Sequence, residues 1–376
     1  MNQEGKVTVI PEQLTKARRA LGLEPNEVAD ALGIDVEGLN RWERGTSEPS
    51  LEDLWNLAEL YKRSTDYFLR PLPALPEHLS FRLKHLYKIQ DLPPKVREVI
   101  VRFEELCRAE AELEEALQKP HPILIEKADR SYDSEELADK ERRRLGLGER
   151  PIRDLRGLLA SQGIRVFVLP VPDILSVELS GVSWWHDDYG PCILVNGRNN
   201  PGRRSFTLAH EYAHLLHADP ATICAFMLDV PEERSANRFA AAFLMPGPTL
   251  RRSFIELVGP PGTLPLDQDL GRLAGHFAVS LEAMGRRLEQ LELIPSGTTD
   301  SRIAEWEKRP VYYRGRKGPR WRSQLGTKFV SLALEAYSGG HMSVTKLAQY
   351  FGLDVRETLQ VVWESSTPPY RRPGLK

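Results

Sequence analysis

Two histidines and a glutamate with a suggestive spacing lie in the stretch T-L-A-H-E-Y-A-H-L-L-H, residues 207–217. On a helix, residues four apart share one face, so His210 and His214 can bind the same zinc ion at the usual Zn–N distance of about 2.0–2.1 Å. Glu211 lies about 100° further round the helix, where its carboxylate can reach a water on the metal rather than the metal itself. The spacing therefore indicates a metal-dependent hydrolytic site, provided that another element supplies a third ligand.

That third ligand is predicted in the stretch P-E-E-R-S-A-N-R-F-A-A-A-F-L-M-P, residues 231–246, whose apolar residues form the stripe of a buried helix. Glu233 falls on the same side as this stripe, whereas Glu232 is rotated about 100° away. An inward-facing carboxylate is costly unless it is paired or bound to a metal, so Glu233 is the predicted ligand and Glu232 the alternative. Asn237, one turn later, is predicted to hold a ligand histidine.

The chemistry expected of this set is hydrolysis by a metal-bound water. Zinc would lower the pKa of a bound water, and Glu211 would take its proton as the general base. His217 lies on roughly the ligand face, three residues after the second motif histidine. Because three ligands already suffice, we expect His217 to cap the helix or to support a ligand rather than to bind the metal.

A second pattern, near the N-terminus, consists of short amphipathic helices separated by tight turns. The stretches P-N-E-V-A-D-A-L at 25–32 and V-E-G-L-N-R-W-E-R at 36–44 are predicted helices, and Gly33-Ile34-Asp35 joins them with Asp35 as N-cap. Ser50 is expected to cap a further helix. A three-residue turn between two short helices is the helix-turn-helix arrangement.

The recognition helix of such a unit would begin at Val36 and present its exposed side chains to DNA bases. The candidate contacts are Glu37, Asn40, Arg41 and Arg44, of which the asparagine and the arginines suit adenine and guanine. Residues 11–70, however, hold 8 Lys and Arg against 12 Asp and Glu, a net charge of -4 where phosphate binding favours positive charge. Two functions therefore stay open for this region: binding duplex DNA, and recognising a protein such as a similar repressor domain.

Further elements are predicted between and beyond these two sites. The prolines of P-L-P-A-L-P at 71–76 indicate a linker, and 94–118 reads as a long charged helix for packing or dimerisation. Two helices are expected between 134 and 162, and strands at 164–169, 181–185 and 192–196.

A weak repeat relates residues 28–37, 273–282 and 347–356, each with a small residue at the turn, an apolar residue and then an Asp or Ser cap. It predicts three helix-turn-helix-like units. The alternative is that short helical hairpins have converged on one packing pattern.

The segment 302–322 carries 8 basic residues against Glu305 and Glu307, a net charge of +6. Trp306, Tyr312, Tyr313 and Trp321 are interleaved with them, a mixture that suits binding to single strands or to a nucleic-acid backbone. The alternative is a solvated linker whose aromatic residues anchor it to neighbouring domains.

Composition limits the remaining classes of function. A chain of 376 residues with 41% hydrophobic content is long enough for two or three cores. No stretch reaches the length of a membrane span and the first residues contain no apolar export segment, so we expect a cytoplasmic protein without a membrane partner. The scattered Cys107, Cys192 and Cys224 are expected to be buried thiols. A net charge of -2 provides no global attraction to nucleic acid.

Two family resemblances rest on these stretches. The segment G-I-D-V-E-G-L-N-R-W-E-R-G-T-S-E-P-S-L resembles the lambda-repressor-like (XRE-type) DNA-binding domains. The pairing of R-R-S-F-T-L-A-H-E-Y-A-H-L-L-H with E-R-S-A-N-R-F-A-A-A-F-L-M-P resembles the ImmA/IrrE zinc metallopeptidases over roughly 135–295. This second resemblance implies a gluzincin-like fold with a small sheet, zinc on His210, His214 and Glu233, and Glu211 as the catalytic residue. It also implies cleavage of a lambda-repressor-like repressor in response to stress.

The expected protein is therefore of the α+β class, mostly α. We predict a five-helix helix-turn-helix domain at 1–70, a linker and long helix at 71–133, a zinc metallopeptidase domain at 134–296 with a helix-turn-helix-like segment at 267–292, and a basic linker with a C-terminal helical region at 297–376. The predicted function is a zinc endopeptidase that regulates transcription by cleaving a repressor, with DNA as a further partner and a homodimer left open. The alternative is a DNA-binding regulator whose zinc domain senses a ligand or metal without proteolysis.

Overall fold

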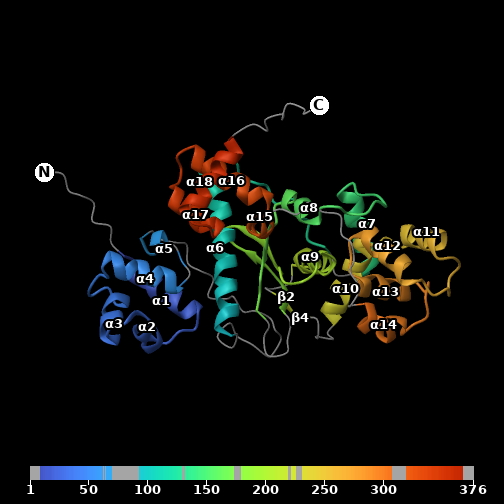
Figure 1. Ribbon diagram of the computed structural model, residues 1–376, viewed down its shortest axis with the longest axis horizontal. Helices are drawn as coiled ribbons and strands as arrows, with labels where there is room; N and C mark the ends of the chain where they lie inside the picture. Colours follow the sequence, from blue (N-terminus) through green and yellow to red (C-terminus); the bar gives the residue numbers. More distant parts are fainter. Residues whose placement is uncertain are drawn as a thin grey trace, which may run out of the picture. The chain divides into compact units, whose positions relative to one another are not determined.

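The chain forms two compact units in the computed structural model (Figure 1), and each is described by itself. The first unit lies within residues 1–75, 100–121 and 318–376, and the second within residues 76–99 and 122–317. The structure describes residues 9–61, 63, 65–69, 93–128, 132–172, 179–218, 222–225, 231–306 and 319–366. None of the helices in these ranges is both long and apolar enough to cross a lipid bilayer.

The N-terminal part of the first unit is a bundle of five helices, as predicted: α1 (Pro11–Ala20), α2 (Pro25–Leu32), α3 (Val36–Glu43), α4 (Leu51–Tyr61) and α5 (Thr65–Leu69). Its core contains Leu14, Val28 and Leu39, all fully buried. Ser50 caps α4 as predicted, because its Oγ accepts a hydrogen bond from the Asp53 N–H at 3.0 Å.

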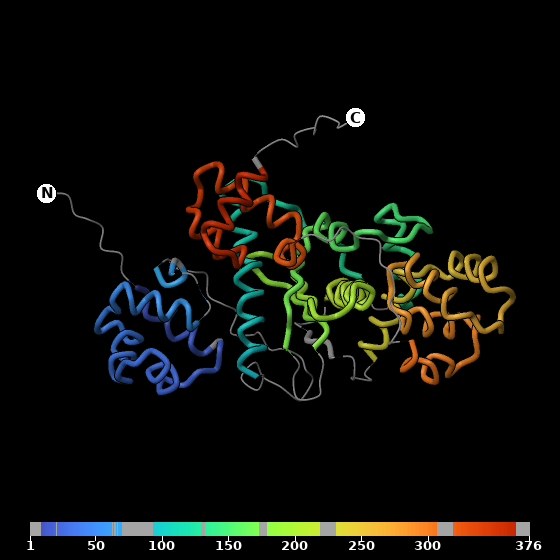
Figure 2. Tube along the Cα trace, in the orientation of Figure 1, coloured from blue at the N-terminus to red at the C-terminus, as the bar shows by residue number. Residues whose placement is uncertain are grey.

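The long predicted helix is α6 (Pro94–Ala116), and within the first unit it packs against segments far away in sequence. Those segments are α16 (Thr327–Ser338) and α17 (Val344–Phe351). They belong to a C-terminal group of helices, drawn in orange to red in Figure 2, that also contains α15 (Arg320–Leu325) and α18 (Val355–Ser366). Lys328 contacts Glu110 and Glu114 of α6 at 2.9 and 2.6 Å. Arg63, which follows α4, donates to Glu104 at 2.7 Å in a buried ion pair. The α6 residues that carry these pairs therefore serve packing within the chain.

A four-stranded sheet forms the centre of the second unit. Its strands are β1 (Arg165–Leu169), β2 (Leu179–His186), β3 (Gly190–Asn196) and β4 (Thr222–Ala225), in the order β1-β3-β2-β4. β1 pairs in parallel with β3, and β2 runs antiparallel to both of its neighbours. The three predicted strands are present, and β4 is one that the sequence did not reveal.

Helices accompany this sheet. They are α7 (Ser134–Arg144), α8 (Leu155–Ser161), α9 (Pro201–Leu216), α10 (Pro231–Leu244), α11 (Gly247–Leu257), α12 (Asp267–Phe277), α13 (Leu281–Gln290) and α14 (Thr298–Trp306). One continuous apolar core contains residues of α7, α9, α10, α12 and α13. The predicted class, α+β and mostly α with a small sheet, is confirmed.

The three repeat units share one turn geometry, at α2–α3, α12–α13 and α17–α18. In each, a left-handed residue ends the first helix: Gly33 at φ 67°, Ala278 at φ 57° and Gly352 at φ 64°. The N–H of the next residue donates to an alanine carbonyl five positions earlier, over 3.0, 3.0 and 3.1 Å for Ile34, Val279 and Leu353. Asp35, Ser280 and Asp354 then cap the second helices. The repeat is therefore a recurring helix-turn-helix connection.

The ends of the basic segment 302–322 are anchored by aromatic side chains. Trp306 is buried in α14, and its indole N–H donates to Asp267 at 3.3 Å. Trp321 stacks on Phe351, with 4.6 Å between ring centroids. Both contacts match the anchored-linker alternative at the two ends. Residues 307–318, which include Tyr312 and Tyr313, lie outside the described residues, as do the predicted linker at 71–76 and the side chain of Cys224.

Candidate metal centre

Two histidines of α9 lie side by side, as their spacing predicted. Asn200 begins the helix by accepting the Arg203 N–H at 2.9 Å, and the helix ends at Leu216. His210 and His214 are both buried, with their ring centroids 4.8 Å apart. Their Nε2 atoms face each other at 3.1 Å.

Glu233 comes to the same point from the first turn of α10. Its Oε2 lies 3.0 Å from the Nε2 of His210, and its Oε1 lies 3.5 Å from the Nε2 of His214. The side chain is buried, as expected for a carboxylate on the inner stripe of this helix. Ligand atoms from the three residues all lie within 4.8 Å of one another.

This donor set fits a zinc ion in spacing and in chemistry. A tetrahedron whose centre lies about 2.0–2.1 Å from each corner has edges of about 3.3 Å. The three observed separations, 3.1, 3.0 and 3.5 Å, lie on both sides of that value. Imidazole nitrogens and a carboxylate are also ligands that zinc accepts. Buried lone pairs in close contact repel one another unless a proton or a cation lies between them.

Asn237 orients one of these rings, as predicted. Its Oδ1 lies 2.9 Å from the Nδ1 of His210. An amide oxygen can only accept, so this contact requires a proton on Nδ1, and in the neutral ring the Nε2 lone pair is then the one that faces Glu233 and His214. This contact favours the tautomer that binds a metal through Nε2.

Glu211 is fully buried, and strand β2 holds its carboxylate. The Ser183 hydroxyl donates to Glu211 Oε2 at 2.6 Å. A β-carbon added at Gly181 would lie 2.5 Å from Glu211 Oε1 and 2.7 Å from Thr207 Cγ2, so only glycine leaves room for this carboxylate. No local pattern in the sequence pointed to either of these β2 residues.

A shared periodicity explains these two contacts. Residues 181, 183 and 185 alternate along β2 and point to one face of the sheet, while residues 207, 211 and 215 follow one another along a face of α9. The Trp185 indole N–H donates to the Leu215 carbonyl at 3.1 Å, at the far end of this row. The alternation of residues along β2 could be seen in the sequence, but the sequence did not show that α9 packs on this face of the strand.

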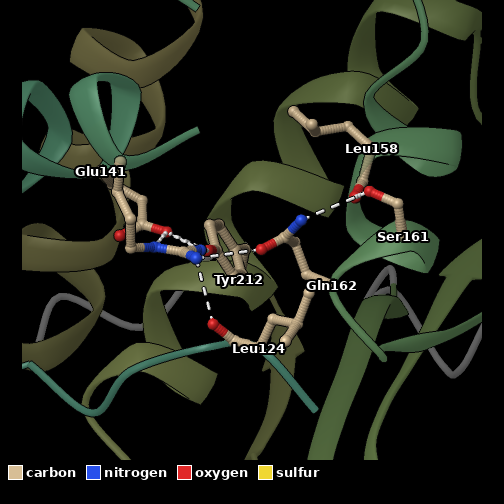
Figure 3. Close-up of polar contacts among 7 residues, drawn as sticks. Leu124, Glu141, Leu158, Ser161, Gln162 and Tyr212 are labelled. Atoms are coloured by element: carbon tan, nitrogen blue, oxygen red, sulfur yellow. Dashed lines mark hydrogen bonds and ion pairs between the residues drawn. The ribbon is translucent and has the colours of Figure 1, made fainter. Parts of the chain in front are cut away.

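Behind α9, Tyr212 belongs to a buried polar network, drawn in Figure 3. Its hydroxyl donates to Glu141 Oε1, which also receives the guanidinium of Arg144. Arg144 further donates to the Leu124 carbonyl at 3.0 Å and to Gln162 Oε1 at 2.9 Å. Burial, and next the nearby charge of Glu141, raise the pKa of Tyr212, so the phenol stays protonated and donates. Tyr212 therefore fastens α9 to α7.

Two other acid and histidine candidates lie outside the cluster of three. His217 is the C-cap residue of α9, and its backbone N–H donates to the Ala213 carbonyl at 3.0 Å. Glu232 precedes Glu233 on α10 and is half-buried. Within the described residues, the only group of at least three His, Cys, Asp or Glu side chains with metal-binding spacing is His210, His214 and Glu233.

The candidate DNA contacts are placed on the surface helix α3. Glu37, Arg41 and Arg44 are exposed and Asn40 is half-buried. Arg44 forms an ion pair with Glu37 at 2.5 Å, and Arg41 approaches Asp35 at 3.9 Å. Both arginines thus already have an acidic neighbour within their own helix or its cap.

Comparisons with known proteins agree with this division of the chain. Residues 159–289 match the family model described as the IrrE N-terminal-like domain, peptidase family M78. Residues 14–68 match the family model described as helix-turn-helix. The chain therefore contains a helix-turn-helix domain of the XRE type followed by an IrrE-like domain, and both predicted resemblances are confirmed.

A further similarity is to a single curated regulator. The chain is 37% identical over 59 residues to the SPbeta prophage-derived HTH-type transcriptional regulator YonR of Bacillus subtilis (strain 168). The match covers 16% of this chain and 55% of that regulator.

Proposed function

We propose that the protein is a zinc-dependent endopeptidase that regulates transcription by cleaving a lambda-repressor-like repressor, and that its helix-turn-helix domain binds duplex DNA. The convergence of His210, His214 and Glu233 in one buried cluster carries the proposal. The match of residues 159–289 to a peptidase family model supports it.

In this proposal, two helices hold the zinc ion. His210 and His214 of α9 and Glu233 of α10 are its ligands, and Asn237 keeps His210 in the metal-binding tautomer. Bound zinc would lower the pKa of a coordinated water and polarise the carbonyl of the scissile peptide. Glu211 then accepts a proton as the general base, and Ser183 positions its carboxylate by donating to Oε2.

The alternative is a regulator whose metal domain is a sensor and cleaves nothing. One observation favours it: the Glu211 side chain is 0% exposed and is held by a strand of the core. A carboxylate in such a place can serve the packing of α9 on β2. Against this, three protein ligands leave a fourth zinc position for water or substrate, whereas structural zinc sites are usually closed by four.

Glu211→Gln separates the two functions, because it keeps the size of the side chain and all three proposed ligands. If the protein is a peptidase, we expect the variant to keep one zinc per chain and to cleave about 10²-fold to 10⁴-fold more slowly. The measurement compares newly formed protein N-termini by mass spectrometry in cells that express the native chain or the variant, and then follows the cleaved protein with purified components.

The matched controls are Glu149→Gln, which removes an exposed carboxylate elsewhere in the same unit, and His214→Ala, which removes a ligand. The first should cleave like the native chain, and the second should neither bind zinc nor cleave. Normal gene regulation by Glu211→Gln together with failure of His214→Ala would establish the sensor and end the peptidase proposal.

A further inference from the structure

A half-buried arginine, Arg204, lies near the start of α9. Its guanidinium forms no hydrogen bond or ion pair within the described residues. Burial lowers the pKa of this guanidinium. Buried arginines of the same unit differ, since Arg142 donates to the Gly148 carbonyl at 2.9 Å and Arg287 donates to Glu135 at 2.6 Å. Arg204 has therefore lost part of its hydration without gaining an acceptor from the described part of the chain.

Thr207 lies one turn further along α9. Its side chain is 1% exposed, and its Oγ1 has no hydrogen-bond partner among the residues that the structure describes. Its Cγ2 would lie 2.7 Å from a β-carbon at Gly181, next to the Glu211 carboxylate. Residues three and four apart share one face of a helix, so Arg204, Thr207 and Glu211 follow one another in a row. This row carries a cation, a hydroxyl and the proposed general base.

A carboxylate is the ligand that suits the first two groups of this row. A guanidinium only donates hydrogen bonds, and a hydroxyl can donate as well as accept. Arginine binds a carboxylate through two parallel hydrogen bonds that also neutralise its charge, whereas a neutral acceptor leaves the charge uncompensated. Partial burial strengthens such a pair, because less water screens it. In an unmodified polypeptide, the carboxylates are those of Asp and Glu side chains and of the C-terminus.

Helix geometry indicates how far this carboxylate would lie from the reacting atoms. Arg204 and Glu211 are seven residues apart, which is about 10 Å along the axis of α9. Side chains on a helix tilt towards its N-terminus, so the Arg204 side chain extends away from Glu211. It is therefore placed to bind the substrate at a distance from the cleaved bond. At about 3.3 Å per residue of an extended peptide, that distance corresponds to about three residues.

We propose that Arg204, assisted by Thr207, binds the carboxylate of an Asp or Glu side chain about three residues from the cleaved bond. The inference rests on the proposed peptidase function and adds a substrate preference to it. Because an endopeptidase cleaves within a chain, the expected source of the carboxylate is a side chain rather than the C-terminus. The protein thus selects acidic sites in its substrates.

Charge exchange tests this preference in the zinc-loaded, full-length chain. Cleavage sites are first identified by mass spectrometry in a library of peptides derived from a proteome. Two synthetic peptides with amidated C-termini then contain the preferred site, one with its acidic residue and one with lysine in that place. For the native chain, we expect kcat/KM to be about tenfold or more higher for the acidic peptide. Arg204→Glu should reverse the preference, because the lysine then meets its complement.

Two further variants complete the test. Arg204→Gln should keep one zinc per chain and cleave both peptides with similar kcat/KM. Arg251→Glu, which changes an exposed arginine of α11, should keep the native preference. The inference would be overturned, and the peptidase proposal left intact, by native cleavage without an acidic preference, by an unchanged preference in Arg204→Glu, or by cleavage at a fixed distance from the C-terminus whatever the side chains. If the native chain cleaved no peptide at all, the peptidase proposal would fail and this inference with it.

Discussion

The buried cluster on α9 and α10 and the face of α3 use similar residue types at helical spacing, but in opposite surroundings. His210, His214 and Glu233 are buried, and their polar atoms lie 3.0–3.5 Å from one another. On α3, Glu37 and Arg44 are about 60% exposed, and the two charges pair with each other.

The difference lies in how strongly the fold specifies each arrangement. Burial makes every misplaced polar atom costly, so few arrangements of the cluster satisfy its polar atoms, and a bound cation would favour the one observed. An exposed ion pair contributes little and exchanges easily with water. The buried site should therefore respond to single substitutions in an all-or-none manner, whereas α3 should respond in small steps.

The largest expected effect is the loss of metal from the buried cluster. His214→Ala and Glu233→Ala each remove one of three proposed ligands, so we expect the zinc content of the purified protein to fall from about one ion per chain to near zero. Elemental analysis of the protein after dialysis against trace zinc measures it.

The control for each variant is the same substitution at a nearby residue of the same type. His217→Ala lies on the same helix as His214, and Glu232→Ala is next to Glu233 on α10. Both controls should keep a full equivalent of zinc. If Glu233→Ala retained zinc while Glu232→Ala lost it, the third ligand would be Glu232.

A smaller effect is expected at the contact between β2 and Glu211. In Gly181→Ala the new β-carbon would lie 2.5 Å from Glu211 Oε1, so the carboxylate must move. We expect the free energy of unfolding to fall by about 1–3 kcal/mol, as for other overpacked cores, while zinc stays bound. Urea unfolding of the zinc-loaded protein measures the change.

Gly271→Ala is the control for this substitution. A β-carbon at Gly271 would meet no atom within 4 Å, and the residue lies inside α12. We therefore expect the free energy of unfolding of the Gly271→Ala variant to rise by about 0.5–1 kcal/mol, because alanine favours the helix more than glycine does. Equal stability losses in both variants would mean that the closeness of Gly181 to Glu211 has no energetic consequence.

Geometry that a single helix or turn fixes by itself could be predicted from the sequence. The spacing of His210 and His214 follows from the helical repeat alone, and Glu233 follows from its place on the apolar stripe of the next helix. The turn at Gly33 was likewise visible, because glycine, an apolar residue and a capping acid occupy consecutive positions.

The missed contacts all join elements that are distant in sequence. Ser183 and Glu211 lie 28 positions apart, and Tyr212 and Glu141 lie 71 positions apart. The packing of the C-terminal helices on α6 joins Lys119 to Glu335 across 216 positions. Which strand lies under which helix depends on the whole core, and no local pattern in one sequence specifies it.

The smallest expected effect is on DNA affinity. It tests whether the ion pair with Glu37 prevents Arg44 from contacting DNA. Glu37→Gln removes one negative charge from a domain of net charge -4 and releases Arg44 from its ion pair. If Arg44 contacts a phosphate, the affinity for duplex DNA should rise and its logarithm should fall more steeply with the logarithm of salt concentration, by about one unit of slope.

Fluorescence anisotropy with labelled duplexes at several salt concentrations measures both quantities. Glu52→Gln, an exposed acid in the first turn of α4, changes the charge of the domain equally and should affect the slope much less. The alternative role of Glu37 is to accept a hydrogen bond from a cytosine amino group. In that case Glu37→Gln would weaken binding to one DNA sequence and leave binding to other sequences unchanged. The ion pair with Arg44 would then position Glu37 to read a base, rather than neutralise Arg44 as a phosphate-binding residue.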